Sequence, residues 1–188
     1  NTKKVFITGA SSGIGNKIAL FFLEKKWSVF SVSRTKPNIK NSKFFWIECD
    51  ITKEDELENI IKTIPVKFDC IINNAGISGA IGPSLLISTG EWRKVFDINF
   101  FACLNVTKNI IEKCNPNATF IFLSGGGAVT PRPLIGPYSI SKLSVVKLAE
   151  QLSSEYKDFR FYSIAPGAHD TKVFHDQFNK LDVHKPQF

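Results

Sequence analysis

Short apolar runs alternate along the chain with longer segments in which apolar residues recur every three or four positions. The short runs are rich in β-branched and aromatic residues, as buried strands are, and they cover residues 4–8, 28–33, 44–48, 69–73, 119–124 and 160–165. The longer segments have the spacing of one helix face, and they cover 14–26, 53–64, 91–113 and 138–156. Strands that are apolar almost throughout are typical of a parallel sheet covered by helices on both faces. The pattern therefore predicts an α/β fold with a doubly wound parallel sheet.

The whole chain, residues 1–188, is expected to form one domain. Its length allows a single substantial core, and its composition, 43% hydrophobic and 22% charged, is that of an ordinary globular protein. In a doubly wound sheet, ligands bind beyond the carboxyl ends of the strands. The residues that follow each predicted strand are therefore the candidates for function.

The segment 8-TGASSGIG-15 places three glycines between the first predicted strand and the first predicted helix. Glycines in this context permit a sharp turn and a close approach of phosphates to the main chain, and the helix N-terminus favours their negative charge. The segment therefore predicts a dinucleotide site. The residues expected to contact the cofactor here are Thr8, Gly9, Ser11, Ser12, Gly13, Ile14 and Gly15.

The second predicted strand ends at Ser33 and Arg34, where a protein that binds NAD usually has an acidic residue for the adenosine ribose. An arginine instead suits a 2′-phosphate, which its guanidinium can engage with two hydrogen bonds. The sequence thus favours NADP over NAD. Further cofactor contacts are expected after the third and fourth strands, from Asp50, Ile51, Asn74, Ala75 and Gly76.

The formal net charge of +7 would also suit a nucleic-acid-binding protein, because basic surfaces attract phosphate backbones. However, the lysines are mixed with acidic residues, as in 53-KEDELENIIK-62, and form no basic stripe. Solvated helix faces explain most of them, and the surplus suits a small polyanionic ligand. A nucleic-acid partner is therefore not expected.

Composition also bears on compartment and metal binding. No run of about 18 apolar residues occurs, so a membrane partner is not expected and a cytoplasmic location is predicted. The four cysteines have no CxxC spacing and lie mostly in apolar runs, which predicts buried thiols without disulfides. His169, His175 and His184 are widely spaced, so no metal site is expected.

The segments that follow the strands stand in the order found in the short-chain dehydrogenase/reductase family, and the chain resembles that family's common subtype. The resemblance implies the Rossmann fold, in three αβα layers. The matching motifs extend over nearly the whole chain, and they are TGxxxGxG at 8–15, Asp50, NNAG at 73–76, Asn99 in 97-DINF-100, Ser124, Tyr138 with Lys142, and 166-PGAHDT-171.

The catalytic pair implied by the resemblance lies in 138-YSISK-142, one helical turn apart, so that both side chains share a helix face. Tyr138 would be the general acid for carbonyl reduction and the general base for alcohol oxidation. Because the pKa of a free tyrosine is near 10, the phenol needs a positive charge beside it. Lys142 would supply that charge and hold the nicotinamide ribose, and Asn99 would support a proton-relay water.

The nicotinamide end of the cofactor is expected to contact Pro166, Gly167 and Thr171, with Thr171 as the partner of the carboxamide. Arg132, held between two prolines in the loop before Tyr138, is either an ordinary exposed residue or the group that binds an anionic part of the substrate.

One departure from the family pattern falls at the serine that orients the substrate carbonyl, thirteen residues before the tyrosine. That position is Gly125, and only Ser124, the residue before it, is a serine. Neighbouring strand residues point to opposite faces, so Ser124 does not simply inherit the role. Three outcomes stay open: Ser124 reaches the site through an altered turn, a main-chain N–H of the glycine run donates instead, or activity is lost.

These observations predict an NADP(H)-dependent oxidoreductase that interconverts a carbonyl and a secondary alcohol in a small-molecule substrate. The alternative is a catalytically weak or inactive NADP(H)-sensing regulator that acts through a protein partner. The resemblance also implies a homodimer or homotetramer. Because family members usually continue past the sixth strand, this chain, which ends at Phe188, is expected to lack the C-terminal lid and the last strand.

Overall fold

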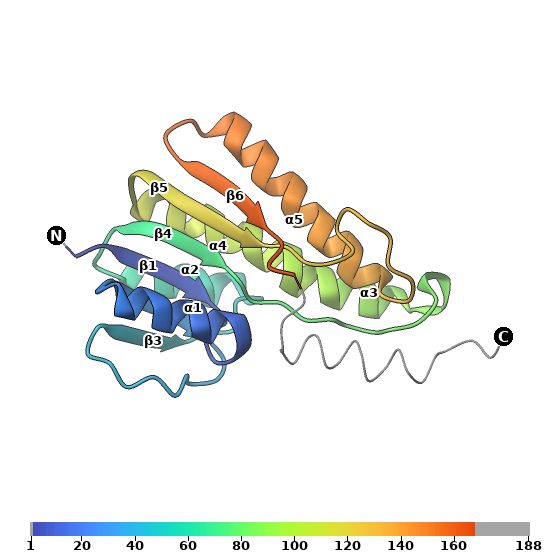
Figure 1. Ribbon diagram of the computed structural model, residues 1–188, viewed down its shortest axis with the longest axis horizontal. Coiled ribbons are helices and arrows are strands. Elements are labelled where there is room, and N and C mark those ends of the chain that lie inside the picture. Colours follow the sequence, from blue (N-terminus) through green and yellow to red (C-terminus); the bar gives the residue numbers. More distant parts are fainter. Residues whose placement is uncertain (1, 168–188) are drawn as a thin grey trace.

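A computed structural model describes residues 2–167, and these residues form one six-stranded sheet with every neighbouring pair of strands parallel. The strand order is β3-β2-β1-β4-β5-β6, and the arrowheads in Figure 1 all lie at one edge of the sheet. This is the order of a Rossmann fold. The strands are β1 Lys4–Thr8, β2 Ser28–Ser33, β3 Phe44–Glu48, β4 Phe68–Asn73, β5 Cys114–Leu123 and β6 Arg160–Ile164.

Helices cover both faces of the sheet. The α-helices are α1 Gly13–Glu24, α2 Glu54–Thr63, α3 Thr89–Phe96, α4 Ala102–Ile110 and α5 Gly136–Glu155. Figure 1 shows α1 in front of the sheet and α2 and α4 behind it. Residues 2–167 also include the 3₁₀ turns η1 Ser84–Leu86 and η3 Ile111–Lys113 and the π-helical turn η2 Asp97–Phe101.

The two faces of the sheet bury two separate cores, which explains why the strands are apolar almost throughout. In β1, Val5 and Ile7 pack with Ala19 of α1, whereas Phe6 between them packs in the other core, with Val106 of α4. Successive strand residues point to opposite faces, so both faces need apolar side chains. The predicted doubly wound α/β fold is confirmed.

The structure differs from the predicted elements in two places. The predicted helix over 91–113 is divided by the π-helical turn Asp97–Phe101. The fifth strand begins at Cys114, five residues earlier than predicted, because Cys114 pairs with Phe68 ahead of an irregular register. Within residues 2–167, none of the helices is long and apolar enough to span a membrane.

Candidate active site

The glycine-rich segment and the NNAG segment meet where the strand order reverses, between β1 and β4. The Thr8 hydroxyl oxygen accepts hydrogen bonds from the N–H groups of Asn74 at 3.0 Å and Ala75 at 3.1 Å. The Asn74 side-chain amide donates to the carbonyls of Thr8 at 2.9 Å and Gly9 at 3.0 Å. Four hydrogen bonds therefore fix the two segments against each other at the edge where such sheets bind ligands.

Glycine is required at Gly9 and Gly15 of this loop. Gly9 has a φ of +75°, a left-handed conformation that other residues rarely adopt. A Cβ at Gly15 would overlap the Gly9 carbonyl and the Asn74 amide, so α1 packs against the loop only because this side chain is absent. The Ser12 hydroxyl makes no capping hydrogen bond to the first turn of α1. The loop and the helix N-terminus thus form a cradle suited to a pyrophosphate.

Ser33 and Arg34 occupy different environments at the end of β2. The Ser33 side chain is buried, donates to the Thr35 carbonyl at 2.8 Å and accepts from the Trp46 indole N–H at 3.0 Å. Arg34, the next residue, is exposed. Ser33 therefore shapes the turn, whereas the Arg34 guanidinium is accessible to a ligand.

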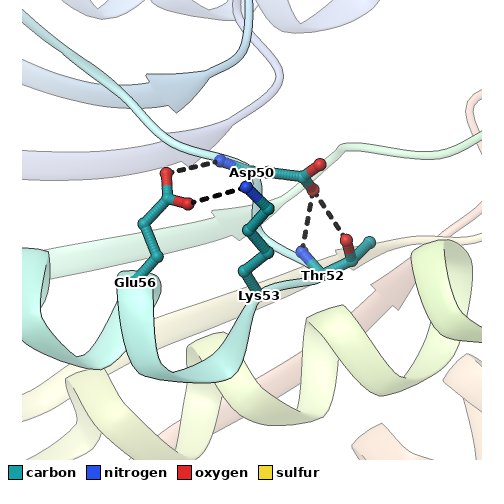
Figure 2. A network of polar contacts seen from close by, with 4 residues as sticks. All are labelled: Asp50, Thr52, Lys53 and Glu56. Carbon is teal, nitrogen blue, oxygen red and sulfur yellow. Dashed lines mark hydrogen bonds and ion pairs between the residues drawn. The ribbon is translucent and has the colours of Figure 1, made fainter.

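Asp50 lies after β3 in a network of polar contacts that leads into α2 (Figure 2). Its carboxylate accepts hydrogen bonds from the Thr52 N–H at 3.1 Å and the Thr52 hydroxyl at 2.8 Å. Partial burial alone would raise the pKa of Asp50, but the Thr52 hydrogen bonds and the charges of Arg34 and Lys53 lower it overall. Glu56 accepts a hydrogen bond from the Asp50 N–H at 3.2 Å and forms an ion pair with Lys53. The next residue, Ile51, is buried. The Asp50 carboxylate is thus ionised at neutral pH.

Tyr138 and Lys142 lie one turn apart at the start of α5, where Pro137 occupies the first turn. The Lys142 ammonium is 5.9 Å from the centre of the Tyr138 ring and donates to the Leu123 carbonyl at 2.8 Å. Burial lowers the pKa of Lys142. Burial raises the pKa of Tyr138, and the positive charge of Arg132 partly offsets this effect. Both groups therefore titrate away from their ordinary pKa values.

Asn99 lies in the π-helical turn and joins three segments of the site. Its side-chain oxygen accepts the Ile77 N–H at 2.8 Å, and its amide donates to the Ile77 carbonyl and the Ser141 hydroxyl, each at 3.0 Å. Ser141 in turn donates to the Tyr138 carbonyl at 2.8 Å. A Cβ at Gly76 would lie 3.1 Å from the Asn99 oxygen and 3.2 Å from the Lys142 ammonium nitrogen. The NNAG segment thus passes directly over Asn99 and Lys142.

Ser124 and Gly125 follow β5, and only Gly125 faces the tyrosine. The Ser124 hydroxyl donates to the Lys142 carbonyl at 3.2 Å, and the Ser124 N–H donates to the Ile164 carbonyl at 2.9 Å. Gly125 lies so close to the Tyr138 hydroxyl that an added Cβ would overlap the phenol oxygen. The Tyr138 phenol therefore occupies the space that a side chain at position 125 would need.

The nicotinamide end of the predicted site is only partly within the described residues. Pro166 and Gly167 follow β6, and Gly167 is exposed with a φ of +83°. Thr171 lies outside the described residues, as do His169, Asp170 and the other two histidines. Within residues 2–167, no cluster of three potential metal ligands occurs.

Ser141, which the sequence pattern did not predict as a site residue, connects Asn99 to Tyr138 and is completely buried. It lies inside the 138–142 segment, but its partners come from η2 and from the turn before it, so sequence pattern alone does not single it out.

The predicted burial of the cysteines is confirmed, and burial raises the pKa of each thiol, to about 11 for Cys103 and about 12 for Cys70.

Comparison with known proteins gives consistent matches over most of the chain. The family model for short chain dehydrogenases matches residues 3–182. An uncharacterised oxidoreductase of Schizosaccharomyces pombe is 33% identical over 181 residues, covering 91% of this chain and 72% of that protein. Glucose 1-dehydrogenase 2 of Bacillus subtilis is 29% identical, covering 88% of this chain and 71% of that protein. The ligand-free aldohexose dehydrogenase of Thermoplasma acidophilum has a similar structure, with a TM-score of 0.88 and 28% identity over 99% of this chain and 74% of its own.

Proposed function

The chain belongs to the short-chain dehydrogenase family of oxidoreductases, and we propose that it interconverts a carbonyl and a secondary alcohol by hydride transfer with NADP(H). The observation that carries the proposal is the convergence of Tyr138, Lys142 and Asn99 beneath the NNAG segment. These groups come from α5 and η2, yet all meet at the carboxyl edge of the sheet.

Tyr138 is the proton donor in this proposal. Burial keeps its pKa above the ordinary value, so the phenol is protonated at neutral pH and can give its proton to a carbonyl oxygen as that oxygen gains negative charge. NADPH, when bound, supplies the hydride. The phenolate left on Tyr138 is stabilised by the ammonium of Lys142 and by the guanidinium of Arg132, and water restores the proton.

The cradle formed by Gly9, Gly15 and the start of α1 fits the pyrophosphate of a nicotinamide dinucleotide. The exposed Arg34 is the group that selects the 2′-phosphate of NADP(H), because no carboxylate takes its place at the end of β2. Asp50 and Ile51 are assigned to the adenine, and Ser11, Ser12, Ile14, Asn74 and Ala75 to the rest of the nucleotide.

The donor that orients the substrate carbonyl is assigned to the main chain of the glycine run at 125–127. The Ser124 hydroxyl is engaged in a hydrogen bond to the Lys142 carbonyl at 3.2 Å. Gly125, by contrast, lies against the Tyr138 hydroxyl. A main-chain N–H beside that hydroxyl can donate to the same oxygen that Tyr138 protonates, as preorganised backbone donors do in other enzymes.

A homodimer or homotetramer is also part of the proposal. Three apolar side chains, Phe101 of η2 and Ile140 and Leu143 of α5, are 49%, 47% and 46% exposed. The two elements pack against each other, and all three side chains are accessible to a second subunit. Exposed apolar faces of this kind are typical of association surfaces.

The test compares wild type with Tyr138→Phe, which removes one oxygen and keeps the ring. NADPH binding is measured by energy transfer from tryptophan, and turnover is measured as NADPH oxidation against a panel of ketones and aldehydes. We expect unchanged NADPH binding and a rate lowered by roughly 100-fold or more. Wild type that binds NADPH but reduces no carbonyl would instead favour the cofactor-sensing regulator.

A further inference from the structure

Arg132 lies in the loop between β5 and α5 and is held more firmly than an ordinary surface arginine. Pro131 and Pro133 flank it; a proline fixes its own φ, and Pro133 restricts the backbone of Arg132 to extended conformations. Near the end of the loop, Leu134 accepts a hydrogen bond from the Gly82 N–H at 2.8 Å, and Ile135 forms a bridge with Gly82. The backbone that presents Arg132 is therefore tied to the segment before α3.

The guanidinium of Arg132 lies flat against the glycine run beside the Tyr138 hydroxyl. A Cβ at Gly126 would lie 2.8 Å from the Arg132 Cζ atom and 3.0 Å from each terminal nitrogen. The preceding residue, Gly125, touches the Tyr138 hydroxyl. The guanidinium and the hydroxyl thus lie against neighbouring residues, whose Cα atoms are about 3.8 Å apart. One small molecule can therefore contact both groups.

The charge of Arg132 is not neutralised by a neighbour. Among residues 2–167, no carboxylate lies within ion-pair distance of it, and the residue is exposed. The positive charge of Arg132 is close enough to the Tyr138 phenol to lower its pKa. An exposed, oriented guanidinium beside a proton donor presents two parallel N–H groups to a planar anion.

We propose that Arg132 binds a carboxylate attached directly to the reacting carbonyl, so that the substrate pair is a 2-oxo acid and its 2-hydroxy acid. This inference rests on the proposed function. In the reduction, the hydride from NADPH forms the new C–H bond, the proton of Tyr138 forms the new O–H bond, the carbonyl π bond breaks, and NADP⁺ is the oxidised product. The carboxylate takes no part in bond exchange; it holds the carbonyl in line between Tyr138 and the glycine run.

The experiment compares two probes of nearly equal shape, phenylglyoxylate and 1-phenylpropane-1,2-dione, in which an acetyl group replaces the carboxylate. With wild type, we expect kcat/KM to be higher for phenylglyoxylate. Losing a hydrogen-bonded ion pair costs about 1.5–3 kcal/mol, so Arg132→Gln should lower kcat/KM for phenylglyoxylate roughly 10- to 150-fold. The diketone has no charge to lose, so its kcat/KM should fall much less than that of phenylglyoxylate, and only through the effect of Arg132 on Tyr138.

Two further variants sharpen the comparison. Arg132→Lys keeps the charge but not the planar fork, so its kcat/KM for phenylglyoxylate should lie between those of wild type and Arg132→Gln. Arg160→Gln is the matched control: Arg160 is exposed but begins β6, at the amino edge of the sheet, and its loss should change neither probe.

Equal losses for both probes with Arg132→Gln, or a wild type that prefers the diketone, would overturn the inference and leave the proposed function standing. Should neither probe be reduced, calorimetric binding decides. Phenylglyoxylate that binds the NADPH complex of wild type and not that of Arg132→Gln supports a carboxylate site, whether or not the panel of ketones and aldehydes is reduced. No binding to either protein overturns the inference.

Discussion

Gly125 and the hydroxyl of Tyr138 are in such close contact that the site has no room for a side chain at position 125. In the family's usual pattern this position is a serine that assists the tyrosine. Here the phenol of Tyr138, on α5, occupies the space beside the end of β5 where that serine side chain would stand. The departure in sequence thus has a counterpart in the position of the Tyr138 phenol, which argues against treating Gly125 as a simple loss.

Gly125→Ser should therefore lower activity, although it restores the family's residue. The new Cβ would push the Tyr138 ring out of position, and misplaced catalytic groups cost about 100-fold for a displacement near 1 Å. The measurement is kcat/KM for carbonyl reduction by wild type, Gly125→Ser and Gly125→Ala, with both variants expected to lose activity alike.

Gly90→Ala is the matched control for this series. Gly90 lies in the first turn of α3, where an added Cβ would meet only the Ser88 hydroxyl oxygen at 3.8 Å. Its activity should equal that of wild type. Greater activity of Gly125→Ser than of wild type would mean that the serine donor is missing and the main chain does not replace it.

The pH dependence of carbonyl reduction should report the pKa of Tyr138. Reduction needs the protonated phenol, and burial raises the pKa of Tyr138, so the phenol should stay protonated through neutral pH and the rate should fall only in alkaline solution. Because burial lowers the pKa of Lys142, loss of its ammonium contributes to the same fall. Arg132→Gln removes a positive charge that lowers the pKa, so the alkaline fall should move to higher pH. Profiles with the uncharged diketone isolate this effect from substrate binding; a fall that moves to lower pH contradicts the assignment.

Asn99→Ala should reduce stability as well as activity. The change removes the partner of the Ile77 N–H and carbonyl and one of the two partners of the Ser141 hydroxyl, and an unsatisfied buried polar group costs about 1–3 kcal/mol. Urea unfolding measures the loss. The control is Asn109→Ala, which removes one hydrogen bond to the Asn105 carbonyl within α4 and should cost about 1 kcal/mol or less. Equal stability of the two variants would show that Asn99 does not fasten the site.

Cofactor selection should depend on Arg34. Removing this guanidinium should weaken NADPH binding by roughly 10-fold or more and leave NADH binding unchanged, because only NADPH carries the 2′-phosphate. Trp46, whose indole N–H donates to Ser33 next to Arg34, is a built-in fluorescence reporter for the titration. An Arg34→Ala variant with equal losses for the two nucleotides would contradict the assignment.

The layered sheet could be predicted from sequence because each strand needs apolar residues on both faces. Val5, Phe6 and Ile7 show this directly, since neighbours along β1 enter different cores. The glycine loop could be placed for a similar reason: Gly9 and Gly15 have local requirements of conformation and contact.

The π-helical turn at Asn99 could not be predicted, because its partner Ile77 lies 22 residues earlier and meets it only in the folded chain. The same holds for Ser33, which hydrogen-bonds to Trp46 across β2 and β3. The absence of the serine at Gly125 was visible in the sequence, but the lack of space there depends on how α5 packs against β5. The residue roles in cofactor binding and catalysis remain predictions.

The most direct test of the central claim is transfer of deuterium from NADPH that carries deuterium at both nicotinamide C4 positions to a carbonyl substrate, followed by mass spectrometry of the alcohol. We expect wild type to place one deuterium on the carbinol carbon. Tyr138→Phe should bind labelled NADPH equally well but form this product more slowly, by roughly 100-fold or more. Wild type that binds NADPH without transferring the label, or Tyr138→Phe that transfers it at the wild-type rate, would contradict the account.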